Sequence, residues 1–188
     1  MTSSSPAAAA ASSAAVTPAA VAASASQAAA SASASAASGA GPSAGTACAS
    51  LDLGAHVGLA QGTAGSIYQV IYFTNLSKTP CTLYGYPGVA LAAGSSQVNQ
   101  VGAAASRSSA TAPTVVTLDA GQSANATLRI VEAGNYPTGT CQPTATTFLQ
   151  IFPPGQTTPI YLAYKSTGCS SSAVNLLSVS VMTSGTGG

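Results

Sequence analysis

Few side chains in this chain could do chemistry, and His56 is considered first because it is the only histidine. A hydrolase that combines a serine, a histidine and an acid would have to use it. Asp52 shares its expected strand and face, but four residues of extended chain separate the two by about 13 Å, beyond hydrogen-bond reach. Asp119 could approach only through tertiary folding, and no GxSxG motif is present. We therefore expect an exposed strand histidine, with an envelope-acting hydrolase using His56 as the alternative.

The acidic residues are equally scarce, because Asp52, Asp119 and Glu132 are the only three. Glycoside hydrolysis needs a pair of carboxyl groups, and calcium needs about six to eight oxygen ligands, mostly carboxylate. The cysteines form no CxxC motif or Cys/His cluster that would bind zinc, and neither GxGxxG nor a P-loop occurs. The sequence thus predicts no catalytic, cofactor-binding or metal-binding residue, and no cofactor.

Tyrosines are the remaining candidates for a binding site. A set of five could line a sugar-binding or protein-binding face, because tyrosine combines an apolar ring with a polar group. The competing interpretation is that several of them fill or rim the core of a domain with only three Phe, and we favour it. Tyr86, beside Pro87, is expected to form a structural corner. The five tyrosines are Tyr84, Tyr86, Tyr136, Tyr161 and Tyr164.

Charge excludes one class of partner. Charged residues make up only 4% of the chain, and the net charge is +1. Binding to nucleic acid needs a clustered basic surface, which four dispersed Lys/Arg do not supply. Solubility must come from Ser, Thr, Asn and Gln, a pattern more common outside the cell. We expect an extracellular or cell-envelope protein, monomeric, that binds an envelope component or another protein and no nucleic acid.

Residues 1–47 differ in composition from the rest of the chain. They are almost entirely Ala and Ser, without a charged or aromatic side chain. They lack the positive n-region and apolar core of a secretory signal, and no run of about 20 strongly apolar residues predicts a transmembrane segment. We expect a disordered, low-complexity linker at 1–47 and a folded domain at 48–188, with the export signal outside this chain.

The four cysteines predict disulfides. Cys48 precedes one expected hairpin and Cys81 follows it, while Cys141 and Cys169 bracket another. The two ends of an antiparallel hairpin lie side by side, within the roughly 4.4 to 6.8 Å Cα separation that a disulfide requires. We predict the pairs Cys48–Cys81 and Cys141–Cys169, which points to an oxidising compartment.

From residue 48 onward the apolar pattern has a period of two, which indicates strands. Residues 51–60 predict a half-buried strand with Leu51, Leu53, Ala55, Val57 and Leu59 on one face. Residues 66–75 are apolar on both faces and predict a central strand. Further strands are expected at 82–91, 114–118, 123–131, 147–152, 160–165 and 174–182, with a short one near 97–101.

Two details of this pattern concern the connections. The turn at 119–121 predicts a hairpin between 114–118 and 123–131, with Arg129 pointing outward. Gly85, Pro87 and Gly88 interrupt 82–91, and proline inside such a run argues for an edge strand or a bulge. With no convincing helix, the series predicts an all-β fold, an antiparallel immunoglobulin-like β-sandwich, with a β-barrel as the alternative.

Residues 73–91, FTNLSKTPCTLYGYPGVAL, carry a family resemblance. This segment is similar to the signature of a family of secreted or lipid-anchored actinobacterial proteins defined by a domain of unknown function, and TLDAGQSANATL at 117–128 supports it, with Ala120 where that family usually has proline. The resemblance implies an all-β exported domain behind an Ala/Ser-rich linker and carries no catalytic residues. Its signature residues here are Asn75, Cys81, Gly85, Tyr86, Pro87 and Gly88. Asn75 begins a glycosylation sequon, but we interpret it as a turn residue whose side chain bonds nearby backbone.

Overall fold

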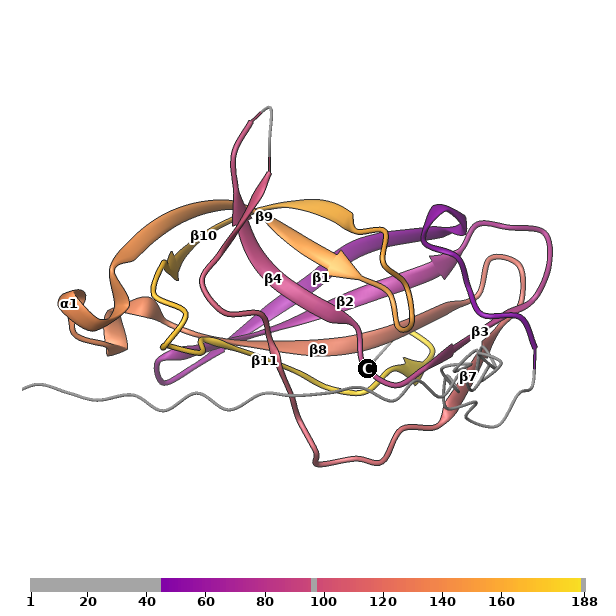
Figure 1. Cartoon of the computed structure of the whole chain (residues 1–188). Coiled ribbons are helices and arrows are strands. Elements are labelled where there is room, and N and C mark those ends of the chain that lie inside the picture. Colours follow the sequence, from indigo (N-terminus) through magenta and orange to yellow (C-terminus); the bar gives the residue numbers. More distant parts are fainter. Residues whose placement is uncertain (1–44, 96–97, 187–188) are drawn as a thin grey trace, which may run out of the picture. The chain divides into compact units, whose positions relative to one another are not determined.

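The computed structural model describes residues 45–95 and 98–186. Residues 1–44 of the predicted linker lie outside the described residues. Residue 97, where the predicted short strand begins, also lies outside them. Figure 1 shows the described chain as strands joined by loops, with helical turns between some of them. The all-β prediction is confirmed.

The larger sheet runs in the order β1, β2, β8, β11, β6, and β12 also pairs with β8. All its pairs are antiparallel except the parallel pair of β11 with β6. β2 lies between β1 and β8, so it is the central strand that the sequence predicts. The bounds are β1 (Leu53–Thr63), β2 (Ser66–Asn75), β8 (Ser123–Val131), β11 (Leu177–Val179), β6 (Ser106–Arg107) and β12 (Thr183–Ser184).

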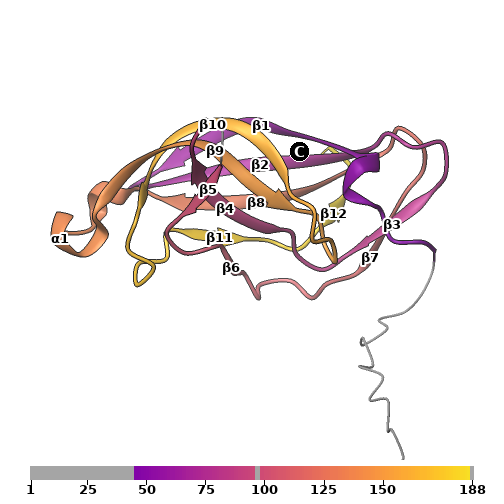
Figure 2. The same ribbon diagram turned by 45° about the horizontal axis from the view of Figure 1, so that its top comes forward.

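A second sheet has the order β10, β9, β4, β5, and β3 pairs with β7 in a separate two-stranded sheet. Figure 2 shows the second sheet stacked over the first, and in the described residues neither sheet closes on itself, which favours the sandwich over the barrel. The bounds are β3 (Cys81–Tyr84), β4 (Gly88–Ala93), β5 (Asn99–Val101), β7 (Val115–Leu118), β9 (Pro143–Phe152) and β10 (Ile160–Cys169).

The hydrophobic core lies between the two sheets. Phe73 of β2 and Leu128 of β8 face it from the larger sheet, while Leu91 of β4 and Leu149 of β9 face it from the other. All four are at most 1% exposed. Since burying a side chain of this size contributes about 1.5 to 3 kcal/mol, this shared core is what holds the sheets together.

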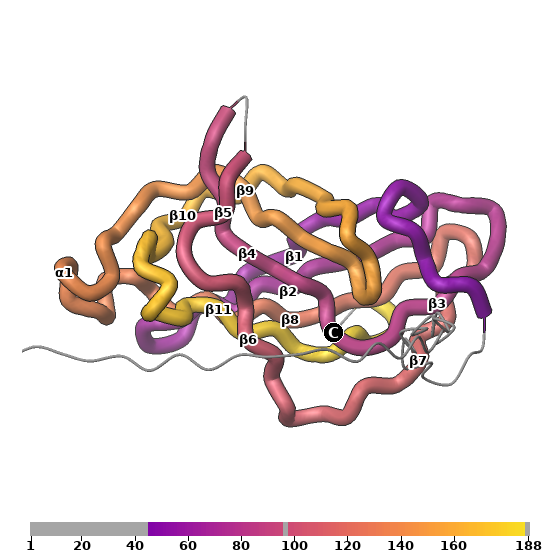
Figure 3. The backbone as a smooth tube through the Cα atoms, in the orientation of Figure 1, coloured from indigo at the N-terminus to yellow at the C-terminus, as the bar shows by residue number. Residues whose placement is uncertain are grey.

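Short helical turns occur at the ends of the sandwich, where the sequence predicts no helix. They are η1 (Ser50–Asp52), η2 (Ala133–Asn135) and α1 (Thr138–Cys141). Segments of three or four residues carry no apolar periodicity, so the pattern could not reveal them. In Figure 3 α1 and the β3–β7 pair lie at opposite ends of the sandwich.

The predicted apolar face of 51–60 is wrong at both ends. Leu51 and Leu59 are each 89% exposed. Leu51 lies in η1 rather than in a strand, and a bulge between Val57 and Ala60 shifts the register of β1 against β2. Because side chains alternate across a strand, one extra residue turns those that follow to the other face.

Gln69 compensates for this bulge from the inner face of β2. Its amide nitrogen Nε2 donates a hydrogen bond to the Gly58 carbonyl at 2.6 Å, and its side chain is only 3% exposed. The amide thus supplies a partner to a carbonyl of the irregular segment.

Two connections also differ from the prediction. The segments at 114–118 and 123–131 do form strands, but not a hairpin, because β7 pairs with β3 and β8 pairs with β2. The segment at 82–91 divides into β3 and β4 of different sheets, and β4 is flanked by β9 and β5 rather than lying at an edge. β9 and β10 are longer than predicted, whereas the last predicted strand shrinks to β11.

Candidate functional site

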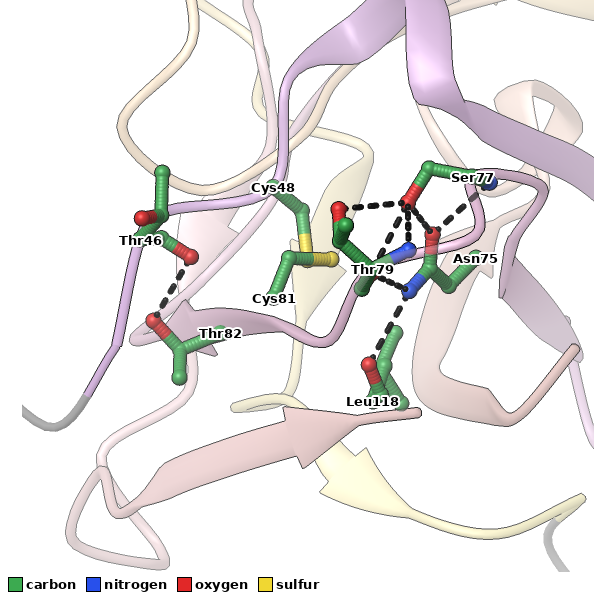
Figure 4. The surroundings of a disulfide bond; sticks show 8 residues. All are labelled: Thr46, Cys48, Asn75, Ser77, Thr79, Cys81, Thr82 and Leu118. Atoms are coloured by element: carbon green, nitrogen blue, oxygen red, sulfur yellow. Dashed lines mark hydrogen bonds between the residues drawn. A yellow bond between two sulfur atoms is a disulfide. The ribbon is translucent and has the colours of Figure 1, made fainter. Parts of the chain in front are cut away.

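The two predicted disulfides are both formed, one at each end of the sandwich. Cys48 is joined to Cys81 with the Cα atoms 4.9 Å apart, and Cys141 to Cys169 with the Cα atoms 4.6 Å apart. All four cysteines are buried. Figure 4 shows the first disulfide, which joins the segment before η1 to the start of β3. In the same place, the Thr82 amide donates to the Thr46 carbonyl at 2.9 Å. Such bonds are typical of an oxidising environment.

The side chain of Asn75 holds the signature segment together by hydrogen bonds near this disulfide. Its side chain is fully buried, and its nitrogen Nδ2 donates to the carbonyls of Thr79 at 2.9 Å and Leu118 at 3.0 Å. Its oxygen Oδ1 accepts from the Ser77 amide at 3.0 Å and from the Ser77 hydroxyl at 2.7 Å (Figure 4). The backbone of Asn75 bonds Gly121 and Gln122, which fixes the chain between β7 and β8. Every polar group of this amide is therefore used within the fold, as expected of a turn residue.

The other signature residues redirect the chain from one sheet to the other. Gly85 has a φ of +97°, a conformation that glycine adopts readily, and its carbonyl accepts from the Met182 amide at 2.8 Å. The Tyr86 hydroxyl donates to the Ser108 carbonyl at 2.9 Å, and the Arg107 guanidinium lies 5.6 Å from the centre of its ring. A side chain at Gly88 would press on Phe152, whose Cβ lies 3.3 Å from an added Cβ. The segment acts as a structural corner.

A polar recess of about 280 Å³ lies beside the Cys48–Cys81 disulfide. The exposed side chain of Asp52 is on its rim, and the Asp52 carbonyl accepts from the Leu76 amide at 2.8 Å. The Ser77 hydroxyl is already bonded to Asn75 Oδ1 and to the backbone of Thr79, and the Thr79 hydroxyl lies 3.5 Å from it. Its lining residues are Thr46, Ala47, Ala49, Asp52, Ser77, Thr79, Pro80 and Cys81.

His56 lies on the outer face of the larger sheet. Its ring stacks on Tyr72, with the ring centres 4.8 Å apart and an angle of 26° between the planes. Asp52 belongs to η1 and Asp119 to the turn after β7. Within residues 45–95 and 98–186, His56 forms no ion pair with either acid and no group of three potential metal ligands is found.

The five candidate tyrosines do not share a surface. Tyr86, Tyr136 and Tyr164 pack against the core, and burial raises the pKa of the Tyr164 hydroxyl. Tyr84 and Tyr161 are 48% and 41% exposed but lie on β3 and β10, in different sheets. Tyr136 lies between η2 and α1 in the chain, whereas Tyr84 ends β3, and Figure 3 shows α1 and β3 at opposite ends of the sandwich.

An apolar pocket that the sequence does not predict opens at the α1 end. It has a volume of about 420 Å³, within the usual range for small-molecule sites. The Gly65 carbonyl accepts from the Glu132 amide at 3.0 Å and from Asn135 Nδ2 at 2.8 Å, so η2 is fastened to the β1–β2 turn. The lining residues are Ile67, Ile130, Val131, Glu132, Ala133, Gly134, Pro143, Ser166 and Thr167. They come from four separate segments, so spacing along the chain gives no signal for them.

The family comparison covers most of the domain. The family model described as "Domain of unknown function (DUF4232)" matches residues 48–183. No curated protein and no solved structure matches the chain significantly. Among the described helices, none has the length and apolar character needed to cross a membrane.

Proposed function

This chain belongs to the DUF4232 family of domains of unknown function, and we propose that its domain is an exported, non-enzymatic binding module of the cell envelope. The Ala/Ser-rich segment ahead of it would be a spacer that holds a monomeric domain at a distance from its anchor point. The actinobacterial envelope, which the signature segment suggests, is the proposed setting.

The pair of disulfides is the observation that carries this proposal. Cytosolic reductants keep thiols reduced, whereas exported proteins keep such bonds. Here the bonds lie at the two ends of the sandwich and join buried cysteines. In the chain-entropy account, each loop of 33 or 28 residues contributes roughly 3 to 4 kcal/mol to the folded state. Much of the stability of the fold would then depend on an oxidising compartment.

The arrangement of polar groups supports binding rather than turnover. The corner residues use their polar groups on one another, and His56 faces an aromatic ring. A rigid sheet that presents fixed side chains is suited to recognition, because little conformational entropy is lost when a ligand binds.

Co-sedimentation tests the proposal directly. The full chain, isolated without reductant, is incubated with envelope fragments of an actinobacterium, with the reduced and alkylated chain as the matched control. We expect saturable binding of the oxidised chain, no labelling by a thiol reagent, and envelope material recovered with unchanged mass. Absence of saturable binding would overturn the binding function, four free thiols would overturn export, and release of envelope fragments would overturn the non-enzymatic assignment.

A further inference from the structure

The outer face of the larger sheet carries a row of side chains in register across three strands. Tyr68 of β2 lies opposite Arg129 of β8, which lies opposite Ser178 of β11. Their chain neighbours Ile130 and Leu177 point into the core, so this row points away from it. The row borders a recess of about 230 Å³, lined by Tyr68, Ser108, Thr127, Arg129, Ser178 and Ser180.

Arg129 brings an uncompensated positive charge to this recess. The side chain is exposed, and its nitrogen Nη2 donates to the Ser66 hydroxyl at 3.0 Å. In the part of the chain that the structure describes, no carboxylate forms an ion pair with it. A guanidinium has five N–H donors in a planar fork that matches a carboxylate or a phosphate. Most of that fork is free to bind an anion.

Hydroxyl-bearing residues line the recess together with Arg129. In the described residues, the side-chain hydroxyls of Tyr68, Thr127, Ser108 and Ser178 form no hydrogen bond with the protein. Ser180 differs, because its hydroxyl accepts from the Thr127 amide at 2.9 Å and donates to the Val181 carbonyl at 3.0 Å. The free hydroxyls can each donate and accept, which is what a ligand rich in hydroxyl groups requires.

The aromatic ring of Tyr68 adds an apolar surface to these polar groups. Tyr68 is 36% exposed and lines the recess, opposite Arg129 in the neighbouring strand. A partly exposed aromatic ring offers an apolar surface next to polar groups. A sugar ring has the matching form, with C–H groups on its faces and hydroxyls around its edge.

We propose that this outer face binds an acidic saccharide. The acid group, carboxylate or phosphate, binds the Arg129 guanidinium; the sugar ring stacks on Tyr68; and its hydroxyls bond to Thr127 and Ser178. All these groups lie on paired strands, so the site is rigid before the ligand arrives. This inference rests on the proposed function, for which it names the ligand class and the face.

The test is calorimetric titration of the full oxidised chain with three probes. These are oligogalacturonate, a phosphorylated oligogalactan of the same length, and the neutral oligogalactan of the same length. We expect binding of at least one acidic probe, weakened by salt, and none of the neutral probe. Arg129→Gln should raise the Kd about tenfold or more, since a charge-assisted bond is lost, while Arg129→Lys should have an intermediate effect.

Tyr68→Thr removes the ring but keeps a residue that favours strands, and it should raise the Kd about five- to tenfold. Two controls change similar groups on the other sheet: Lys165→Gln removes an exposed cation on β10, and Tyr161→Ala removes an exposed ring on the same strand. Both should leave the Kd within about twofold of the parent value. A third control is Gly134→Tyr, which fills the mouth of the apolar pocket, since an added Cβ at Gly134 meets no atom within 4 Å.

Each alternative result overturns the inference in a recognisable way. Equal binding of acidic and neutral probes would remove the acid requirement. Loss of binding in Gly134→Tyr but not in Arg129→Gln would move the site to the apolar pocket. Saturable envelope binding without any saccharide binding would overturn the inference and leave the proposed function intact, whereas loss of both would overturn both.

Discussion

The signature corner and the outer face of the larger sheet use their polar side chains in opposite ways. At the corner, the Asn75 amide is fully buried and all its hydrogen-bonding capacity is spent inside the fold. On the outer face, Arg129 is exposed with a single side-chain bond, to Ser66, and within the described residues four of the hydroxyls that line the recess beside it have no protein partner. The first region is built to hold the chain, and the second is available to a ligand.

This contrast separates the residues that carry the sequence resemblance from the residues of the proposed binding face. The corner attracts notice in the sequence because glycine, proline, cysteine and asparagine have special backbone roles. The outer-face residues lie in regular strands, and their residue types have no comparable backbone role. A variant series can therefore test whether stability and binding divide between the two regions.

Removing either disulfide should have the largest effect on stability. The double replacements Cys48→Ala with Cys81→Ala, and Cys141→Ala with Cys169→Ala, should each lower the free energy of unfolding by about 3 to 4 kcal/mol, because the unfolded chain is no longer constrained. Urea denaturation followed by circular dichroism measures this. The first pair tests the corner. If it lowered the free energy of unfolding by less than about 1 kcal/mol, the Cys48–Cys81 disulfide would not be what stabilises the start of the domain.

Asn75→Ala should come next, with a loss of about 2 to 3 kcal/mol. The change removes the side-chain donor of the buried Leu118 carbonyl and leaves the Thr79 carbonyl with the Ser77 hydroxyl alone. Asn75→Asp is the matched control, because it keeps the acceptor for Ser77 but also lacks the donor. Both should be destabilised in urea, and a stable Asp variant would show that the donated bonds are not what matters.

Gln69→Leu tests the contrast between structural and binding residues at the position next to Tyr68. It leaves the Gly58 carbonyl at the bulge unpartnered, so the free energy of unfolding should fall by about 1 to 2 kcal/mol. Saccharide affinity should stay within about twofold, because Gln69 points to the inner face. If stability were unchanged, the bulge would not depend on this bond.

Much of the architecture could be predicted from the sequence, for reasons that particular residues show. The alternation of Ala124, Ala126, Leu128 and Ile130 predicts β8 and its buried face correctly. The positions of the cysteines around two strand pairs predict both disulfides correctly. The strand bulge that exposes Leu59 could not be seen, because it depends on pairing with β2 rather than on the local pattern. The partner of β7 was missed for the same reason, since Asn75 inserts between β7 and β8 only in the folded chain.

The candidate binding site was predicted only in fragments. Arg129 was expected to point outward, and it does. Its neighbour Tyr68 and the hydroxyl groups of β11 and the segment after β6 come together only through strand register. The five tyrosines first considered are separated by the same topology.

Substitutions on the outer face should have little effect on stability. Arg129→Gln should lower the free energy of unfolding by about 1 kcal/mol or less, since the position is exposed and the bond lost is the one to the buried Ser66 hydroxyl. A loss above about 1.5 kcal/mol in urea would mean that Arg129 supports the fold rather than a ligand, and the contrast between the two regions would fail.

The smallest effect concerns a tyrosine that packs against the core. Burial raises the folded-state pKa of Tyr164 above its ordinary value of 10.0. The unfolded chain therefore releases its proton first, so this group lowers stability progressively as pH rises above about 10 and has no effect at neutral pH. Tyr164→Phe should match the parent at pH 7 after its own packing difference is subtracted, and lose less stability above pH 10. Parallel pH curves would contradict this.

The most direct test of the division between a structural corner and a binding face is a nitrogen-15 chemical-shift titration of the full oxidised chain with oligogalacturonate and with a phosphorylated oligogalactan. We predict saturable shifts of the amides of Tyr68, Thr127, Arg129 and Ser178 with at least one of the two, while those of Asn75, Ser77 and Cys81 remain unchanged. Shifts confined to the corner, or no saturable shift on β2, β8 and β11 with either probe, would contradict the account.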